Sequence, residues 1–137
     1  ARTGAVEAAG AVWEVIAPKI GGVVLDNVDA VAAKQKIDGG PSVLYDAVAV
    51  LPSAEGAVLL AQDAPAKDFV SDAFAHCKFI GVGADAEPLF AAARIPPELD
   101  EGCVALGSGK DAKAFVAACA ALRFWPREVT VDLDAMA

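Results

Sequence analysis

Residues 47–52, which read AVAVLP, are the stretch of this chain that decides its fold class. The run is apolar without polar alternation, a pattern typical of a strand that is covered on both faces and therefore belongs to a parallel sheet. Similar short runs occur at 79–82 (FIGV) and 103–106 (CVAL), with helix-like segments between them. Short buried strands that alternate with helices predict an α/β fold, with an open, doubly wound, mainly parallel sheet and helices on both of its faces.

Helices are predicted between these strands from turn residues and from apolar spacing. Ser53 begins a helix that runs to Gln62, and Pro65 begins another that ends near Cys77. Further helices are predicted at 87–93 and 110–122. Apolar residues at helical spacing predict the buried stripes of two of these helices. In the helix that begins at Pro65 the stripe consists of Phe69, Val70, Ala73 and Phe74. In the helix predicted at 110–122 it consists of Phe115, Val116, Cys119 and Leu122.

The two ends of the chain depart from this alternation. Residues 12–16 predict a short strand, and 21–37 predict a hairpin or a pair of extended arms. Pro126 stops the last helix from extending, so we divide the chain into a domain at 1–122 and a tail at 123–137. Folds of this class usually begin with a central strand, whereas this chain begins inside a predicted helix. We therefore expect a fragment whose first strand is missing.

Length and charge narrow the classes of partner. The 137 residues fit one domain, and 56% hydrophobic residues are enough to build a core. Eleven Lys and Arg against 19 Asp and Glu give a net charge of −8, and the cations do not cluster. A nucleic-acid binder needs a basic surface, and an anionic membrane would repel this chain. No run approaches the roughly 18 apolar residues of a membrane span. We therefore expect neither a nucleic-acid nor a membrane partner.

The three cysteines, Cys77, Cys103 and Cys119, form no recognisable disulfide or zinc pattern. Their number is odd, no C-x-x-C occurs, and His76 is the only histidine. We interpret them as mostly buried thiols in a reducing cytoplasm, which predicts a cytoplasmic protein. Cys77 is predicted to be the most reactive, because the neighbouring imidazole of His76 favours the thiolate. Cys103 and Cys119 are predicted to react slowly.

The turn at 83–85 is the most informative candidate site, because sites in doubly wound sheets form where the strands end. A hydrolase-type nucleophile elbow would place Cys or Ser directly after the strand at 79–82. The turn instead reads GAD. Cys77 and His76 precede that strand, so we expect them at the opposite end of the sheet, away from this site.

The remaining candidates are weak phosphate-loop and cation-site signals. Gly81-x-Gly83 and Gly107-x-Gly109-Lys110 lack the neighbouring residues that a phosphate loop needs. Two groups of carboxylates could bind a cation, although solvated loop acids are the commoner case. These groups are Glu98, Asp100 and Glu101, and Asp132 with Asp134. The sequence thus assigns no catalytic residue, no cofactor-binding residue and no metal ligand.

Four segments carry a specific resemblance to a known family. They are 39–50 (GGPSVLYDAVAV), 68–81 (DFVSDAFAHCKFIG), 100–104 (DEGCV) and 122–128 (LRFWPRE). Together they resemble the C-terminal domain of large-subunit haem catalases. The resemblance implies a flavodoxin-like domain related to the class I glutamine amidotransferase superfamily. In the catalases the elbow cysteine of that superfamily is missing, and Gly83-Ala84 agrees with this.

The resemblance implies a non-catalytic accessory domain whose parent enzyme disproportionates hydrogen peroxide to water and oxygen at a haem. Catalases hold the haem iron through a tyrosine with an arginine four residues before it. The only tyrosine here is Tyr45, and Pro41 stands four residues before it. We therefore expect no cofactor in this chain and a catalytic core that precedes it. The implied role is to support folding, homotetramer assembly and stability of the parent through contact with that core, with a chaperone-like activity also suggested.

Two alternative functions and the position of one aromatic pair stay open at this point. The chain could be a stand-alone cysteine hydrolase or glyoxalase-like enzyme that uses Cys77 or Cys103, or it could be a flavin-binding module. The aromatic pair Phe124-Trp125 is a candidate contact on the outside of the domain, and packing of Trp125 in the core is the equal alternative.

Overall fold

The main sheet of the computed structural model consists of three parallel strands, β5 (Ala47–Val50), β6 (Phe79–Val82) and β7 (Cys103–Ala105), in the order β5-β6-β7. The structure describes residues 6–17, 23–24, 30–31, 35–37, 40–107 and 109–131. In the register, Val48 lies beside Ile80 and Ile80 beside Cys103. The three apolar runs of the sequence are thus confirmed as strands of one parallel sheet.

Both faces of β6 are covered, because successive side chains of a strand point to opposite faces and Phe79, Ile80 and Gly81 are all buried. In β5, Val48 and Val50 are buried but Ala49 is exposed, so the prediction that this strand is covered on both faces is wrong. Ile80 and its neighbour Val48 belong to one buried cluster, together with apolar residues of the helices on that side. Phe79 belongs to a second cluster with Leu106 and Phe115. The mixed α/β class is therefore confirmed.

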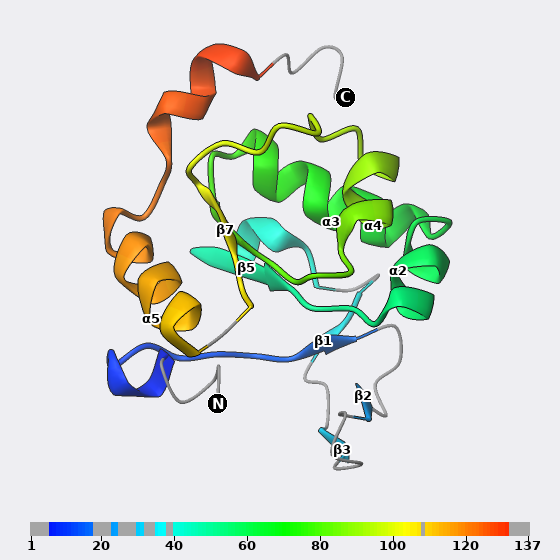
Figure 1. Ribbon diagram of the computed structural model, residues 1–137, viewed down its shortest axis with the longest axis horizontal. Helices are drawn as coiled ribbons and strands as arrows, with labels where there is room; N and C mark the ends of the chain where they lie inside the picture. The colour runs from blue at the N-terminus through cyan, green and yellow to red at the C-terminus, as the bar shows by residue number, and fades with distance from the viewer. Residues whose placement is uncertain are drawn as a thin grey trace.

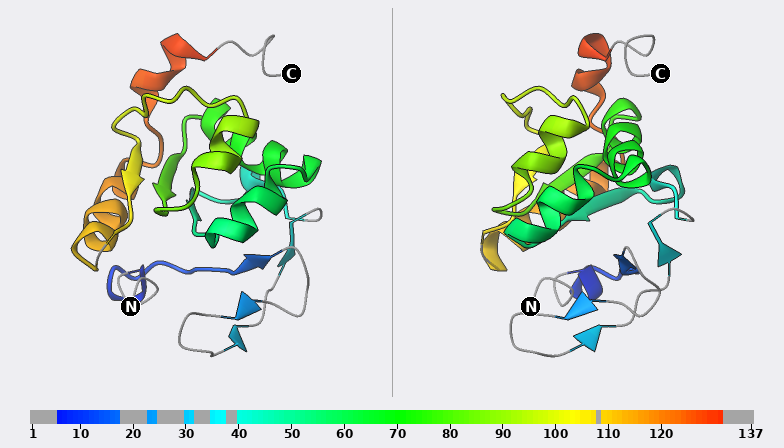
Figure 2. Two further views of the ribbon diagram at one scale, coloured as in Figure 1. Left: turned by 45° about the vertical axis from the view of Figure 1, so that its right-hand side comes forward. Right: turned by 90° about the vertical axis from the view of Figure 1, so that its right-hand side faces the viewer.

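Four helices alternate with the strands and lie on two sides of them. They are α2 (Ala54–Leu60), α3 (Ala64–Ala75), α4 (Glu87–Ala92) and α5 (Gly109–Ala118). Figures 1 and 2 show α5 on one side of the strands and α2, α3 and α4 on the other. The start of α2 after Ser53 is confirmed, since Ser53 Oγ accepts from the Gly56 N–H at 3.0 Å. α3 begins at Ala64, one residue before the predicted start at Pro65, because Asp63 Oδ2 accepts from the Ala66 N–H at 3.2 Å.

The described chain also contains a helical turn at residues 6–8 and seven other short elements. Three are 3₁₀ helices, η1 (Ser42–Leu44), η2 (Cys119–Ala121) and η3 (Trp125–Thr130). Four are two-residue strands, β1 (Ile16–Ala17), β2 (Val23–Val24), β3 (Ala30–Val31) and β4 (Gln35–Lys36). β1 pairs with β4 in parallel, and β2 pairs with β3 antiparallel.

Two predicted boundaries are wrong. The strand predicted at 12–16 begins only at Ile16, because β4 offers a partner to two residues, and Val12 is 89% exposed. The last helix was predicted to reach Leu122 with that side chain inward. Instead α5 ends at Ala118, and Leu122 is 58% exposed with a φ of 66°, a left-handed conformation that turns the chain toward β6.

Candidate functional site

The carboxyl end of β6 carries the turn that the sequence singles out. The Gly83 N–H donates to the Val50 carbonyl at 2.8 Å, and a Cβ at Gly83 would lie 2.9 Å from the same oxygen. Glycine is therefore required where the two strand ends approach each other. The next two side chains, of Ala84 and Asp85, are exposed. The turn presents a methyl group and a carboxylate rather than the thiol or hydroxyl of a hydrolase elbow.

In the glycine turn after β7, a backbone N–H already donates to a side chain of the protein itself. The Gly107 N–H donates to Asp111 Oδ2 at 3.0 Å, and Asp111 lies in the first turn of α5. A phosphate loop would offer such an amide to an anionic ligand. Here a carboxylate of the helix accepts it, so the Gly107-x-Gly109-Lys110 signal lies at a helix start with its first amide already in use.

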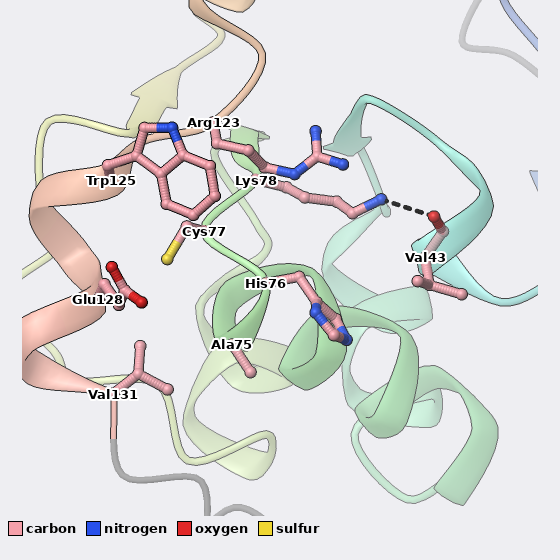
Figure 3. Close-up of a pocket in the computed structure, with 9 residues that line it drawn as sticks. All are labelled: Val43, Ala75, His76, Cys77, Lys78, Arg123, Trp125, Glu128 and Val131. Atoms are coloured by element: carbon pink, nitrogen blue, oxygen red, sulfur yellow. Dashed lines mark hydrogen bonds between the residues drawn. The ribbon is translucent and has the colours of Figure 1, made fainter.

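A cavity of about 310 Å³ lies at the opposite, amino end of the main sheet. Its lining, drawn in Figure 3, comes from the end of α3, the start of β6, η1 and the segment from Arg123 onward. The nine lining residues are Val43, Ala75, His76, Cys77, Lys78, Arg123, Trp125, Glu128 and Val131. The prediction that His76 and Cys77 precede the strand and lie away from its carboxyl end is confirmed.

The sharp turn that ends α3 places Cys77 in this cavity wall. The N–H of Cys77 donates to the Phe74 carbonyl and that of Lys78 to the Ala73 carbonyl, both at 3.0 Å. Cys77 has a φ of 57°, in the left-handed region that most side chains avoid. The thiol is 3% exposed, and its burial raises the pKa.

That Cys77 reacts fastest of the three thiols stays a prediction, and the effect of burial on its pKa outweighs that of the neighbouring Arg127 and Arg123. Cys103 and Cys119, which were predicted to be buried, are half-buried. Desolvation raises the pKa of Cys103 to about 12 and that of Cys119 to about 11. All three thiols are consequently held in their protonated, weakly nucleophilic form at neutral pH.

Lys78 is the first of two buried cations that organise this end of the fold. Its side chain is fully buried, and its ammonium donates to the carbonyls of Ser42 at 2.8 Å and Val43 at 3.0 Å and also to that of Tyr45. An ammonium group has three donors, so these carbonyls use all of them. Burial, followed by the charge of Arg123, lowers the pKa of Lys78. Lys78 thus fixes the η1 turn directly before β5.

Arg127 is the second buried cation, and it attaches η3 to the sheet. Its Nε donates to Asp100 Oδ2 at 2.6 Å and its Nη2 to Asp100 Oδ1 at 2.9 Å, a bidentate ion pair. Its Nη1 donates to the carbonyls of Lys78 at 2.8 Å and Phe74 at 3.3 Å. A Cβ at Gly102 would lie 2.6 Å from Nη2, so the ion pair also requires that glycine.

Aromatic rings enclose the Arg127 guanidinium. It lies 4.4 Å from the ring centroid of Phe74 and 5.6 Å from that of Phe124, within the range of cation–π attraction. Phe124 also packs edge-on against Phe79, with centroids 6.0 Å apart. Trp125 is 62% exposed. Of the predicted aromatic pair, Phe124 therefore packs inward, and Trp125 alone is available on the outside.

Glu98, Asp100 and Glu101, the predicted cation-site carboxylates that the structure describes, form no metal-binding group. Asp100 pairs with Arg127, so the interpretation of Asp100 as a solvated loop acid is wrong. Glu98 and Glu101 are exposed, and Asp132 and Asp134 lie outside the described residues. In the described ranges from 6 to 131, no group of three His, Cys, Asp or Glu side chains could hold a metal ion.

Sequence reasoning missed Lys78 and Arg127 as organising residues. Each forms its side-chain contacts with residues distant in the chain, 33–36 residues away for Lys78 and 24–53 for Arg127. A signal was nevertheless present, because both lie inside the segments that carry the family resemblance.

Within the described part of the chain, no helix has both the length and the apolar character that crossing a membrane requires.

Comparison with known proteins identifies the family of this chain. Residues 3–129 match the family model described as the C-terminal domain found in long catalases. The chain is also 50% identical over 129 residues to Catalase C of Rhizobium meliloti (strain 1021), a match that covers 94% of this chain and 18% of that relative. The chain belongs to the family of C-terminal domains of long catalases.

Proposed function

We propose that this chain is the non-catalytic accessory domain of a long catalase, where it supports folding, tetramer assembly and stability of the parent enzyme. The observation that carries the proposal is the turn after β6. In a chain of this family, the position where related α/β hydrolases hold their nucleophile reads Gly83-Ala84-Asp85. The buried cations support it further, because Lys78 and Arg127 are committed to internal contacts.

The haem and the peroxide chemistry of the parent belong, in this proposal, to the rest of the long catalase. The residues of this chain do not fit a haem. Catalases ligate haem iron through tyrosine, and Tyr45 is the only one here. Its hydroxyl donates to Glu14 Oε2 at 2.8 Å, and burial together with Glu14 raises its pKa to about 12. A phenol held so firmly in its protonated form is poorly suited to bind iron as a phenolate.

The enzyme alternatives find less support. A cysteine hydrolase or glyoxalase-like enzyme would need a thiolate, whereas burial raises the pKa of both Cys77 and Cys103. A flavin module would need free backbone amides at a strand end, and the Gly107 N–H already donates to Asp111. No contact in the described chain favours either function over the accessory role.

The finer fold and the setting of the domain belong to the same proposal. We infer a flavodoxin-like, doubly wound sheet of the class I glutamine amidotransferase-like superfamily, in which a further strand pairs with the outer edge of β5. Two apolar clusters on opposite faces of the main sheet support it. The partners are the catalase core of the same chain and its homotetramer. A net charge of −8 supports the absence of nucleic-acid and membrane partners, and a cytoplasmic location completes the proposal.

The test compares the full-length catalase that carries this domain with a variant from which residues 1–137 of this sequence are deleted. We expect equal haem content and equal initial peroxide turnover, but faster thermal inactivation and a lower yield of tetramer on refolding. Equal heat resistance and equal tetramer yield would contradict the accessory role. Peroxide decomposition by the haem-free chain alone would contradict the non-catalytic assignment, and suppression of heat aggregation of an unrelated protein would support the chaperone-like activity.

A further inference from the structure

The proposed accessory role assigns no function to the cavity at the amino end of the main sheet. Its volume of about 310 Å³ falls in the range of sites that hold small ligands. Val43, Ala75, Trp125 and Val131 give it apolar walls. Trp125 lines the cavity while 62% of its surface is exposed, so the indole ring offers an uncovered apolar face to a ligand.

The charged groups of the cavity are mostly cationic. Lys78 and Arg123 line it, and Glu128 is its one carboxylate. With His76 neutral, the lining carries two positive charges and one negative charge, whereas the whole chain carries −8. Figure 3 shows the side chains of Arg123, Lys78 and His76 toward one side of the cavity and Glu128 on the other. The cavity is therefore positive at one end within an acidic protein.

Arg123 is the cation of the cavity that has hydrogen-bond donors available. Its Nη1 donates to the carbonyls of Leu122 at 2.8 Å and Asp46 at 3.4 Å. Its Nε and Nη2 have no partner among the residues that the structure describes. Lys78 contributes charge alone, because its three donors are used by carbonyls. The Nε–Nη2 edge of a guanidinium presents two parallel donors that match the two oxygens of a carboxylate.

We propose that this cavity binds a small organic monoanion, namely a carboxylate that carries an apolar or aromatic group. The carboxylate pairs with Nε and Nη2 of Arg123, close to the charge of Lys78. The apolar part lies against the Trp125 ring in the direction of Val131. Glu128 at the other side repels a second negative charge, which favours monoanions over dianions.

The test is a titration of the complete chain with benzoate and with benzamide, which share a shape but differ in charge. Binding is followed through the indole N–H signals of the two tryptophans by ¹⁵N-correlated NMR. We expect benzoate to shift the Trp125 signal saturably, with a dissociation constant on the order of 1 mM. Benzamide should bind at least about fivefold more weakly. The Trp13 indole, which donates to Glu7 at 3.0 Å outside the cavity lining, should not move. Equal binding of the two probes, or no shift of Trp125, would overturn the proposal.

Two substitutions with opposite expected effects on benzoate affinity distinguish a loss of binding from a loss of folding. Arg123→Gln should weaken benzoate at least about fivefold and leave benzamide unchanged, whereas Glu128→Gln should strengthen benzoate about twofold to fivefold. Lys113→Gln on the exposed surface of α5 is the control and should change neither. A misfolded variant cannot bind more tightly, so a failure of Glu128→Gln to strengthen benzoate would contradict the proposed electrostatics even if Arg123→Gln unfolds the domain.

Discussion

Replacing Asp100 by Ala removes the carboxylate that pairs with buried Arg127. Loss of one partner of a buried ion pair costs about 3–5 kcal/mol, because the remaining charge is left in a poorly solvated site. The Asp100 side chain is 26% exposed, and the guanidinium keeps the carbonyls of Phe74 and Lys78. We therefore expect the lower end of that range, about 3 kcal/mol. A 137-residue chain unfolds with about 0.3 kcal/mol/K of entropy, so Tm should fall by about 10 °C.

The assay is urea unfolding followed by circular dichroism, with Glu101→Ala as the matched control. Glu101 is the exposed neighbour of Asp100, so its loss should change the free energy of unfolding by less than about 0.5 kcal/mol. A double-mutant cycle with Arg127→Met isolates the pair, since the second substitution should add little once Asp100 is gone. A cost below about 1 kcal/mol for Asp100→Ala would refute the reasoning.

The same pair predicts how stability depends on pH. Burial alone would raise the pKa of Asp100, but the hydrogen bonds and charge of Arg127 and the Gly102 N–H outweigh it and lower that pKa. A carboxyl group whose folded pKa lies below its unfolded value of about 3.9 stabilises the fold above that value and loses this contribution as the pH falls through the folded pKa. The free energy of unfolding should therefore fall below about pH 4 in the wild type, and less steeply in Asp100→Ala.

Three further predictions follow from the buried groups. Lys78→Met should lower the free energy of unfolding, measured with urea, by at least about 2 kcal/mol, because three carbonyls lose their donor. A decrease equal to that of exposed Lys113→Met would contradict this. Gly102→Ala should cost about 1–3 kcal/mol and lower Tm, since a Cβ would contact the guanidinium at 2.6 Å, and an unchanged Tm would contradict it. Cys103, whose pKa is about 12, should stay unreacted with an aromatic disulfide reagent at pH 8 until the protein is unfolded, so fast labelling of the native chain would show that the thiol is accessible.

The sequence predicts those elements whose cause is local. The apolar run at 47–52 predicts the strand β5, although not its burial on one face only, and Ser53 marks the start of α2 through its own side chain. The end of α5 was not predictable in this way. Leu122 continues the apolar stripe, but the chain must leave the helix there for the Phe124 N–H to reach the Cys77 carbonyl at 2.6 Å. A tertiary contact overrides the helical pattern.

The candidate site likewise has one part that local sequence predicts and another that only the fold creates. The Gly-Ala-Asp turn follows from its place after a buried strand, so it could be read without coordinates. The cavity could not, because Val43, Cys77 and Trp125 come from three distant segments that only the fold brings together. Nor does the sequence distinguish buried Arg127 from exposed Arg94, since the difference lies in the carbonyls and rings that surround the guanidinium.

The attachment of Arg127 to the carbonyls of Phe74 and Lys78 has a consequence for the order of events during synthesis. These partners are 53 and 49 residues apart from Arg127 in the chain. A ribosome adds roughly 5–20 residues per second, so roughly 2–10 s pass between translation of Lys78 and of Arg127. During that interval the end of α3 and the start of β6 have been synthesised without their guanidinium, while α2 and α3 are already complete. The amino end of the sheet therefore closes last, and a pause in translation before residue 127 would prolong the exposure of Phe74 and Cys77 to the cell's chaperones.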